Sequence, residues 1–193
     1  MSKPRILVFS GSLRADSYNQ KIAAIAATGA KEAGADITLV SLRDYPMPLF
    51  DQDLEDASGL PAEAQKLKDL FLSHDGLIIA SPEYNSSVTA ALKNAIDWVS
   101  RASAPGEAPV SAFRGKSAAI LAASPGGYGG LRGLVHLRSI LGNIGVTVLP
   151  DQIAIPKAYE AFTPEDQLAD EGQNSAVKEL GAKLSHHLAK LLA

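Results

Sequence analysis

Short apolar runs alternate along the chain with segments whose apolar residues recur at helical spacing. In the helical segments, apolar residues return every three or four positions, as in Ala91, Leu92, Ala95 and Ile96. The apolar runs are too short for helices and predict buried strands. These strands are expected at Arg5–Phe9, Ile37–Leu42, Leu77–Ala80, Ser117–Ala123 and Val146–Leu149. Five alternations of strand and helix are typical of a parallel sheet with helices on both faces.

This alternation predicts an α/β fold with a doubly wound five-stranded sheet. Right-handed crossovers leave few topologies, and five strands favour the flavodoxin-like order 2-1-3-4-5. The length of 193 residues indicates a single domain, residues 1–193. Irregular structure is expected at Arg43–Leu60, Ala104–Arg114 and Pro150–Glu171. A loop as long as the first of these is usually functional or contacts a partner.

Three polar loops follow the first, third and fourth predicted strands. They cover residues Ser10–Asn19, Ser81–Ser87 and Ser124–Gly130 and are rich in serine and glycine. In the order 2-1-3-4-5 these strands are neighbours, so their carboxyl ends share one crevice. Open α/β sheets bind their ligands at that edge. The three loops therefore predict one common site.

The first loop has the character of an anion site. It precedes a helix N-terminus, where unpaired N–H groups and the helix dipole favour negative charge. Ser10, Ser12, Ser17 and Asn19 add uncharged donors, and Arg14 adds a charge or a stacking plane. The loop lacks the Walker A lysine and the G-x-G-x-x-G pattern, which disfavours triphosphates and dinucleotides. A compact monophosphate fits; the alternative is an ordinary serine-capped turn.

The other two loops suit a flat ring. Tyr84 offers an aromatic edge and Asn85 both a donor and an acceptor, although a surface turn is the alternative. Four glycines within Gly126–Gly130 let backbone approach a ligand, the alternative being a flexible turn. Together the three loops describe a site for flavin mononucleotide (FMN). Thr89, or Ser87 just before it, is expected to cap the next helix.

Three segments carry a family resemblance: GSLRADSYN, SPEYNSSVTAALKNAIDW and SPGGYGGLRGLVHLRSIL. They resemble the NADPH-dependent FMN reductase family, which includes chromate and quinone reductases and azoreductase-like enzymes. The connection DYPMPLFDQDLED is also similar to the family's loop after the second strand, so the resemblance covers about residues 5–150. It implies an enzyme that passes hydride from NADPH or NADH through bound FMN to a small acceptor. The implied acceptors are a quinone, free flavin, an azo compound or a metal oxyanion such as chromate.

The resemblance also implies which residues contact FMN. The first loop would hold the phosphate, the second would line the ring, and the third would close its other side. The implied contacts are Ser10, Ser12, Leu13, Arg14, Ser17, Tyr18 and Asn19, then Pro82, Glu83, Tyr84 and Asn85, and finally Ser124, Gly126, Gly127 and Gly130. No strictly catalytic residue is expected, because the flavin carries the redox chemistry. The family commonly has Pro-Gly where this chain has Thr89-Ala90, a change expected to affect the flavin little.

Composition narrows the partners and the location. The net charge of −3 and the lack of a basic run argue against nucleic acid. The absence of cysteine excludes disulfides, thiol nucleophiles and cysteine-ligated metals within this chain, and the four histidines lack metal-ligand spacing. The N-terminal apolar run, Ile6–Phe9, is too short for a signal peptide, and no segment has the length to span a bilayer. A cytoplasmic protein without a metal or a membrane contact is expected.

Two further expectations concern assembly and a rival function. Family members commonly form dimers whose partner chain walls the flavin cleft. Apolar helix surface around Trp98, Val99 and Leu134 agrees with a homodimer or homotetramer. The rival function is a flavodoxin-like FMN-binding electron carrier without NAD(P)H turnover of its own. Such carriers are usually strongly acidic, whereas −3 is a mild charge, so the enzyme is preferred.

Overall fold

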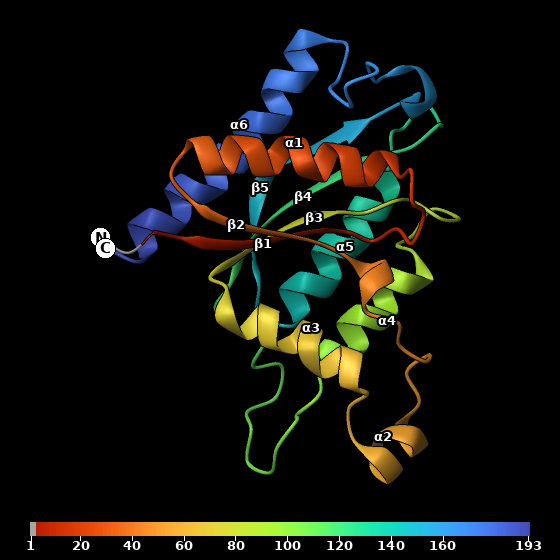
Figure 1. The fold of residues 1–193 in the computed structure, drawn as a ribbon, viewed down its shortest axis with the longest axis vertical. Coiled ribbons are helices and arrows are strands. Elements are labelled where there is room, and N and C mark those ends of the chain that lie inside the picture. The colour runs from red at the N-terminus through yellow and green to blue at the C-terminus, as the bar shows by residue number, and fades with distance from the viewer. Residues whose placement is uncertain (1–2) are drawn as a thin grey trace.

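The computed structural model describes residues 3–193, and it contains a five-stranded sheet in the order β2-β1-β3-β4-β5 (Figure 1). All four strand pairs are parallel, which confirms the predicted class and order. The strands are β1 (Arg5–Ser10), β2 (Asp36–Ser41), β3 (Gly76–Ala80), β4 (Ser117–Ala123) and β5 (Thr147–Ile155). At the centre of the sheet, Ile78 pairs with Val8 on one side and Ala119 on the other.

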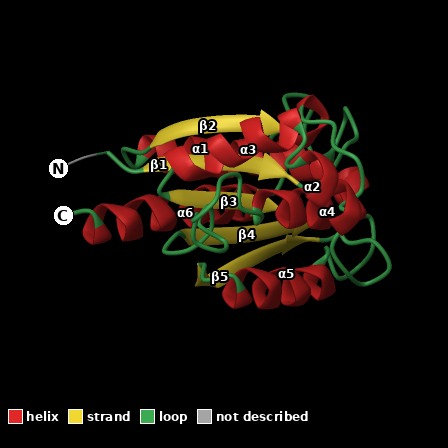
Figure 2. Ribbon diagram, turned by 90° about the horizontal axis from the view of Figure 1, so that it is seen from below, coloured by secondary structure: helices red, strands yellow, loops and turns green. Residues whose placement is uncertain are grey.

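Helices cover both faces of the sheet, as Figures 1 and 2 show. Helices α1 and α6 pack on one face, and α3, α4 and α5 pack on the other. Two short 3₁₀ helices occupy Leu42–Asp44 and Ala158–Glu160. The α-helices are α1 (Tyr18–Glu32), α2 (Gln52–Ser58), α3 (Ala62–Ser73), α4 (Ala90–Val99), α5 (Leu131–Asn143) and α6 (Glu171–Leu191).

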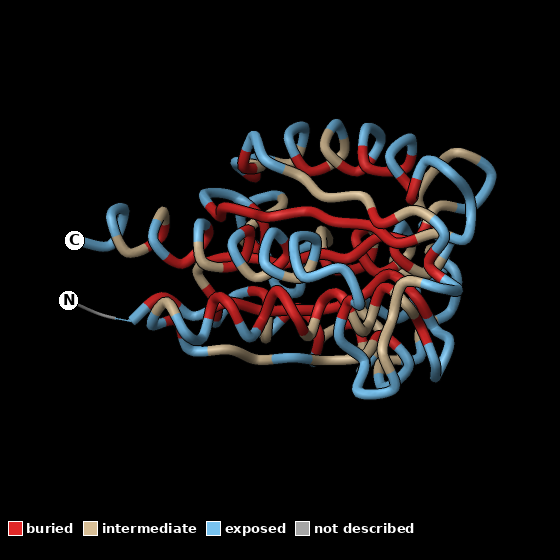
Figure 3. Tube along the Cα trace, turned by 90° about the horizontal axis from the view of Figure 1, so that it is seen from above, coloured by how far each residue is buried: buried red, intermediate tan, exposed pale blue. Residues whose placement is uncertain are grey.

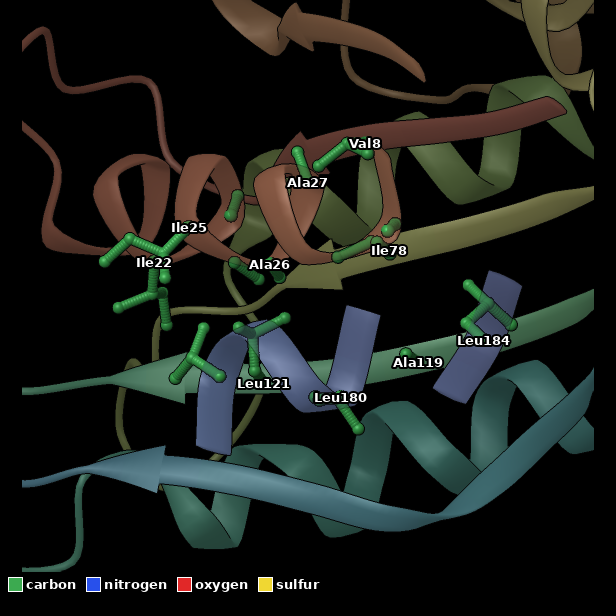
Figure 4. Close-up of a cluster of buried hydrophobic side chains, with 14 of the residues drawn as sticks. Val8, Ile22, Ile25, Ala26, Ala27, Ile78, Ala119, Leu121, Leu180 and Leu184 are labelled. Carbon is green, nitrogen blue, oxygen red and sulfur yellow. The ribbon is translucent and has the colours of Figure 1, made fainter. Parts of the chain in front are cut away.

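The core is divided by the sheet because successive strand residues point to opposite faces. Ile6 and Val8 face the α1 and α6 side, whereas Leu7 and Phe9 face α3, α4 and α5. Figure 4 shows the first of these clusters, with side chains from α1, α6 and three strands in contact. Every residue of β3 and β4 is buried, and Figure 3 shows the buried segments gathered in the middle of the molecule. Burial on both faces explains why these strands are apolar throughout.

The prediction for the fifth strand was too short. β5 continues to Ile155, although Pro150 was expected to begin an irregular segment. The register with β4 shifts between Ala118 and Ile120, so Pro150 lies in a bulge where no ladder N–H is needed. β5 is also an edge strand, where proline is tolerated.

Helix α2 was missed within the long connection 43–60. Its N-cap, Asp51, accepts a hydrogen bond from the Asp53 N–H at 2.9 Å, and Gly59 ends it with a φ of +71°. None of its residues is buried, so it carries no apolar stripe that a sequence pattern could reveal. Figure 1 shows it standing off the body of the domain.

The apolar surface predicted around Trp98, Val99 and Leu134 is present only beside Leu134, at Leu131 and Val135. Trp98, Val99 and Leu134 are fully buried. The Trp98 Nε1–H donates to the Pro48 carbonyl at 2.8 Å, which attaches the long connection to α4. The apolar stripe of the last helix, α6, is buried at Val177, Leu180, Leu184 and Leu188, and Leu191 at its end is 63% exposed.

Candidate functional site

The three predicted loops meet at the carboxyl edge of β1, β3 and β4. Between them lies a pocket of about 70 Å³, here called the three-loop pocket. Its size suits a compact anion rather than a whole nucleotide. The lining residues are Ser12, Arg14, Ser17, Tyr18, Asn19, Pro82, Glu83, Tyr84, Ala123, Ser124 and Pro125. Ala123 and Pro125 were not predicted, and they line the pocket because β4 ends beside them.

Three buried hydroxyls shape the first loop. Ser10 Oγ accepts from the Ser12 N–H at 3.2 Å, and Ser12 Oγ accepts from the Arg14 N–H at 3.1 Å. Ser17 Oγ accepts from the Gln20 N–H at 3.4 Å and so caps α1. Within residues 3–193 none of the three donates its own proton. Ser12 and Ser17 line the three-loop pocket and each keeps a donor for a ligand, whereas Ser10 is fully buried and does not line it.

The first turn of α1 supplies further donors. Ser17 is the N-cap, so the N–H groups of Tyr18 and Asn19 have no partner within the helix. The Asn19 side chain is already committed, because it donates to the Ala123 carbonyl at 2.7 Å and accepts from the Ala123 N–H at 2.9 Å. Asn19 thus ties α1 to the end of β4 instead of presenting a free amide.

Arg14 is the basic residue in the lining of the three-loop pocket, and its side chain is exposed to solvent. Its guanidinium lies 6.0 Å from the centre of the Tyr18 ring. The nearby Lys21 contacts Asp16 and Asp166, each at 2.8 Å, and these contacts raise the pKa of Lys21. Lys21 therefore stays protonated, and the two carboxylates balance its positive charge. The positive charge available to an anion comes from Arg14 and the α1 N-terminus.

The second loop forms a tight turn, here called the Tyr84–Ser87 turn. Tyr84 and Ser87 exchange backbone hydrogen bonds of 3.0 and 3.1 Å. Between them Asn85 and Ser86 have φ angles of +51° and +66°. Neither of their backbone N–H groups finds an acceptor in the described part of the chain. The turn therefore offers two free donors directly after Tyr84, which lines the three-loop pocket.

Glu83 lines the three-loop pocket, and its carboxylate is held by helix α5. It accepts from Arg132 Nε at 2.9 Å and from the Gly133 N–H at 3.0 Å, both in the first turn of α5. Burial alone would raise the pKa of Glu83, but the hydrogen bonds from Arg132 and Gly133 outweigh it and lower the pKa. Ser87 is also joined to α5, because its hydroxyl lies 2.9 Å from His136 Nδ1.

The third loop is only partly turned toward the pocket. Gly126 and Gly127 are exposed beside Ser124, whose Oγ accepts from the Gly126 N–H at 3.3 Å. Gly130 is buried with a φ of +93°, and a Cβ there would lie 2.7 Å from Ala122 Cβ. Its lack of a side chain serves packing, so the predicted contact at Gly130 is not supported. The same holds for Leu13, which is absent from the lining of the three-loop pocket.

Leu13 instead lines two neighbouring pockets. One, of about 330 Å³, also contacts Arg14, Tyr84 and Thr89. The other, of about 400 Å³, lies between α4 and the connection after β2. Because Arg14 and Tyr84 also line the three-loop pocket, the three cavities follow one another along the surface.

Thr89 joins the first two loops. It caps α4 by accepting from the Leu92 N–H at 3.1 Å, which settles the choice between Thr89 and Ser87. Its hydroxyl also donates to the Gly11 carbonyl at 2.6 Å. The capping role follows from the sequence, but the contact with Gly11 does not, because it depends on how β1 and β3 pair.

The fold is that of a flavodoxin-like protein, and the site gathers unpaired donors at the N-terminus of α1 and in the Tyr84–Ser87 turn. The sequence matches the NADPH-dependent FMN reductase family over residues 4–160, and the chain belongs to that family. An NAD(P)H-dependent FMN reductase of Pseudomonas aeruginosa is 37% identical over 91% of this chain and 90% of its own length. We therefore classify the protein as an FMN-dependent oxidoreductase with NAD(P)H as its electron donor.

Two further relatives extend the comparison. A quinone reductase of Escherichia coli K12 is 37% identical over 72% of this chain and 70% of its own length. The structure of FerB, a flavoenzyme NAD(P)H:(acceptor) oxidoreductase from Paracoccus denitrificans, superposes with a TM-score of 0.79 at 26% identity over 98% of each chain. Among residues 3–193, no helix is both long and apolar enough to cross a membrane.

Proposed function

We propose that this protein holds the phosphate of FMN in the three-loop pocket, with the flavin ring beside it at the Tyr84–Ser87 turn, and reduces a small quinone with electrons from NADPH or NADH. The observation that carries the proposal is the gathering of unpaired donors around one crevice: the Ser12 and Ser17 hydroxyls, the α1 N-terminus and the Tyr84–Ser87 turn. Quinone is preferred among the expected acceptors because relatives named quinone reductases match most of the chain.

The chain's own residues would bind and orient the cofactor. Ser12, Ser17 and Arg14 surround the place where a phosphate would meet the α1 N-terminus, and Ser10 supports the loop from below by accepting from the Ser12 N–H. The free N–H groups of the Tyr84–Ser87 turn suit the carbonyl edge of the ring, and the exposed backbone at Gly126 and Gly127 suits its other side. FMN, when bound, supplies the hydride and electron chemistry. No side chain of the pocket is required as a nucleophile.

The neighbouring cavities favour a flat, apolar acceptor. The larger one is lined by Leu13, Leu42, Tyr45, Pro46, Met47 and Ala91, together with Arg43 and Asn94. Apolar walls with a few polar groups are typical of small-molecule sites. A metal oxyanion such as chromate would make few favourable contacts with such walls. Azo compounds and free flavin are expected to fit them better than chromate and less well than a quinone.

The test combines binding and turnover. The purified protein, loaded with FMN and freed of excess, should show a flavin spectrum and should oxidise NADPH faster with a benzoquinone than with chromate. Bound flavin without NADPH oxidation would support the electron carrier instead. A protein that FMN neither colours nor stabilises against heat would overturn the proposal.

We also propose a homodimer or homotetramer. The support is exposed apolar surface on α5 and the loop before it, at Tyr128, Leu131 and Val135. Light scattering at micromolar concentration would report a monomer if the proposal is wrong. The single-domain and cytoplasmic expectations stay predictions, which limited proteolysis and cell fractionation would test.

A further inference from the structure

The Tyr84–Ser87 turn adopts a conformation that its residues do not favour. Asn85 and Ser86 are consecutive non-glycine residues with positive φ. Asparagine tolerates the left-handed region, but serine enters it at a cost. Two backbone hydrogen bonds close the turn. A turn of this kind persists only where its surroundings hold it.

Helix α5 supplies those surroundings at both ends of the turn. Glu83, directly before the turn, contacts Arg132 and the Gly133 N–H, and Ser87, its last residue, contacts His136. The helix lies close enough that a Cβ at Gly133 would sit 3.2 Å from the Ser87 carbonyl oxygen. The Glu83 side chain is only 7% exposed, so its contacts are shielded from water.

The Glu83 carboxylate is engaged by α5 through both of its oxygens, which accept hydrogen bonds from Arg132 and the Gly133 N–H. Glu83 directly precedes the turn that carries the free N–H groups of Asn85 and Ser86. A contact that holds Glu83 therefore also holds the start of that turn.

We propose that Glu83 is a positioning residue, which fixes the Tyr84–Ser87 turn through Arg132 and Gly133 so that its free N–H groups meet the flavin ring. The inference rests on the proposed FMN site. Without the Glu83 contacts the turn relaxes toward the right-handed region, and its donors leave the ring edge. Donors held at that edge stabilise the reduced ring more than the oxidised one, because the reduced ring carries more negative charge.

The test compares Glu83→Gln with the wild type in three measurements. The dissociation constant of FMN should rise about tenfold, the loss expected for a misplaced hydrogen-bonding group. Affinity for reduced FMN should fall about tenfold further, which corresponds to a midpoint potential lower by about 30 mV for two electrons. In the FMN-free protein, the amide protons of Tyr84 and Ser87 should exchange with solvent faster than in the wild type.

Two other variants separate positioning from general stability. Arg132→Met should reproduce the effects of Glu83→Gln, and the double variant should be little worse than either, because both remove one contact. Glu107→Gln breaks the ion pair with Lys68, at 2.6 Å, in the loop after α4. It should lower the heat stability of the protein and leave FMN affinity and potential unchanged.

The outcomes are distinct. If Glu83→Gln behaves like Glu107→Gln, losing heat stability while keeping wild-type affinity and potential, Glu83 is a structural residue and the inference is overturned. If the wild type binds FMN but Arg132→Met has no effect, the contact with α5 does not position the turn. If the wild type binds no FMN, the proposed function itself fails, while amide exchange still reports whether Glu83 holds the turn.

Discussion

The proposed phosphate side of the site, residues Ser10–Asn19, and its proposed ring side, residues Ser81–Ser87, are built in different ways. On the phosphate side, Ser10, Ser12 and Ser17 bond to backbone groups two or three residues away. On the ring side, Glu83 reaches a helix about fifty residues further along the chain. Local contacts form from the sequence of one loop, whereas the ring side depends on the sheet bringing β3 and α5 together.

Two side-chain contacts join the two sides of the site, and substitutions at these contacts are expected to have the largest effects. Asn19 connects α1 to Ala123, and Thr89 connects the Tyr84 loop region to Gly11. Both side chains are buried and hydrogen-bonded to backbone. Breaking either contact should affect both sides together, whereas a change on one side should stay local.

The largest effect is expected for Asn19→Ala. The change leaves the buried N–H and carbonyl of Ala123 unpaired, and each unpaired group costs about 1–3 kcal/mol. Chemical denaturation should show a free energy of unfolding lower by roughly 2–4 kcal/mol, and FMN affinity should fall. The exposed Asn143, at the end of α5, provides the control, since Asn143→Ala should change neither quantity appreciably. An unaltered unfolding curve for Asn19→Ala would contradict the proposed connection.

Thr89→Val should have the next largest effect. Valine keeps the shape but removes both the cap of α4 and the bond to Gly11, at a cost of about 2 kcal/mol. Thr89→Ser retains the hydroxyl and should restore most of the stability measured by denaturation. If serine fails to rescue the protein, the methyl group rather than the hydroxyl makes the contribution, and the two loops are not joined as described.

The phosphate side was the more predictable one because its signals are local. The serines of the first loop, the α1 N-terminus and Thr89 as a cap all follow from residue type and position beside an expected helix. The strand order also followed, since five alternations and right-handed crossovers leave few choices. The family match to residues 4–160 agrees with the resemblance found in the sequence.

The ring side could not be predicted in the same way. Glu83 was expected at the ring because of its place in the Pro82–Asn85 segment. Its partner Arg132 lies in α5, about fifty residues further along the chain, so no local pattern predicts their contact. The burial of Trp98 and Leu134 depends on the sheet and on the connection after β2, which no local pattern reveals. The length of β5 depends on a bulge opposite β4 that makes Pro150 acceptable.

A smaller effect, confined to the phosphate side, is expected for Ser17→Ala. Loss of the α1 cap should cost about 1 kcal/mol of stability. The same change removes a donor from the pocket, so FMN should bind about tenfold more weakly. Asp170 caps α6 in the same way but does not line the pocket, so Asp170→Ala should lower stability without weakening FMN binding. Equal FMN affinities in the two variants would show that Ser17 only caps the helix.

The smallest effect concerns pH and the contact between Glu83 and α5. The pKa of Glu83 is lowered in the folded protein, so its stabilising contribution is present above its unfolded pKa and is lost as pH falls through the folded pKa. The difference in unfolding free energy between the wild type and Glu83→Gln should therefore be constant near neutral pH and shrink below about pH 4.5.

Glu107 provides the comparison for this pH dependence, because hydrogen bonds from Lys68, Ser111 and Ser103 lower its pKa to about 2. The difference between the wild type and Glu107→Gln should persist to lower pH than the difference at Glu83. Denaturation curves at a series of pH values for both variants measure this order. A Glu83 difference that grows on acidification would mean that its carboxylate is destabilised by burial, and that Arg132 and Gly133 do not hold it as the structure shows.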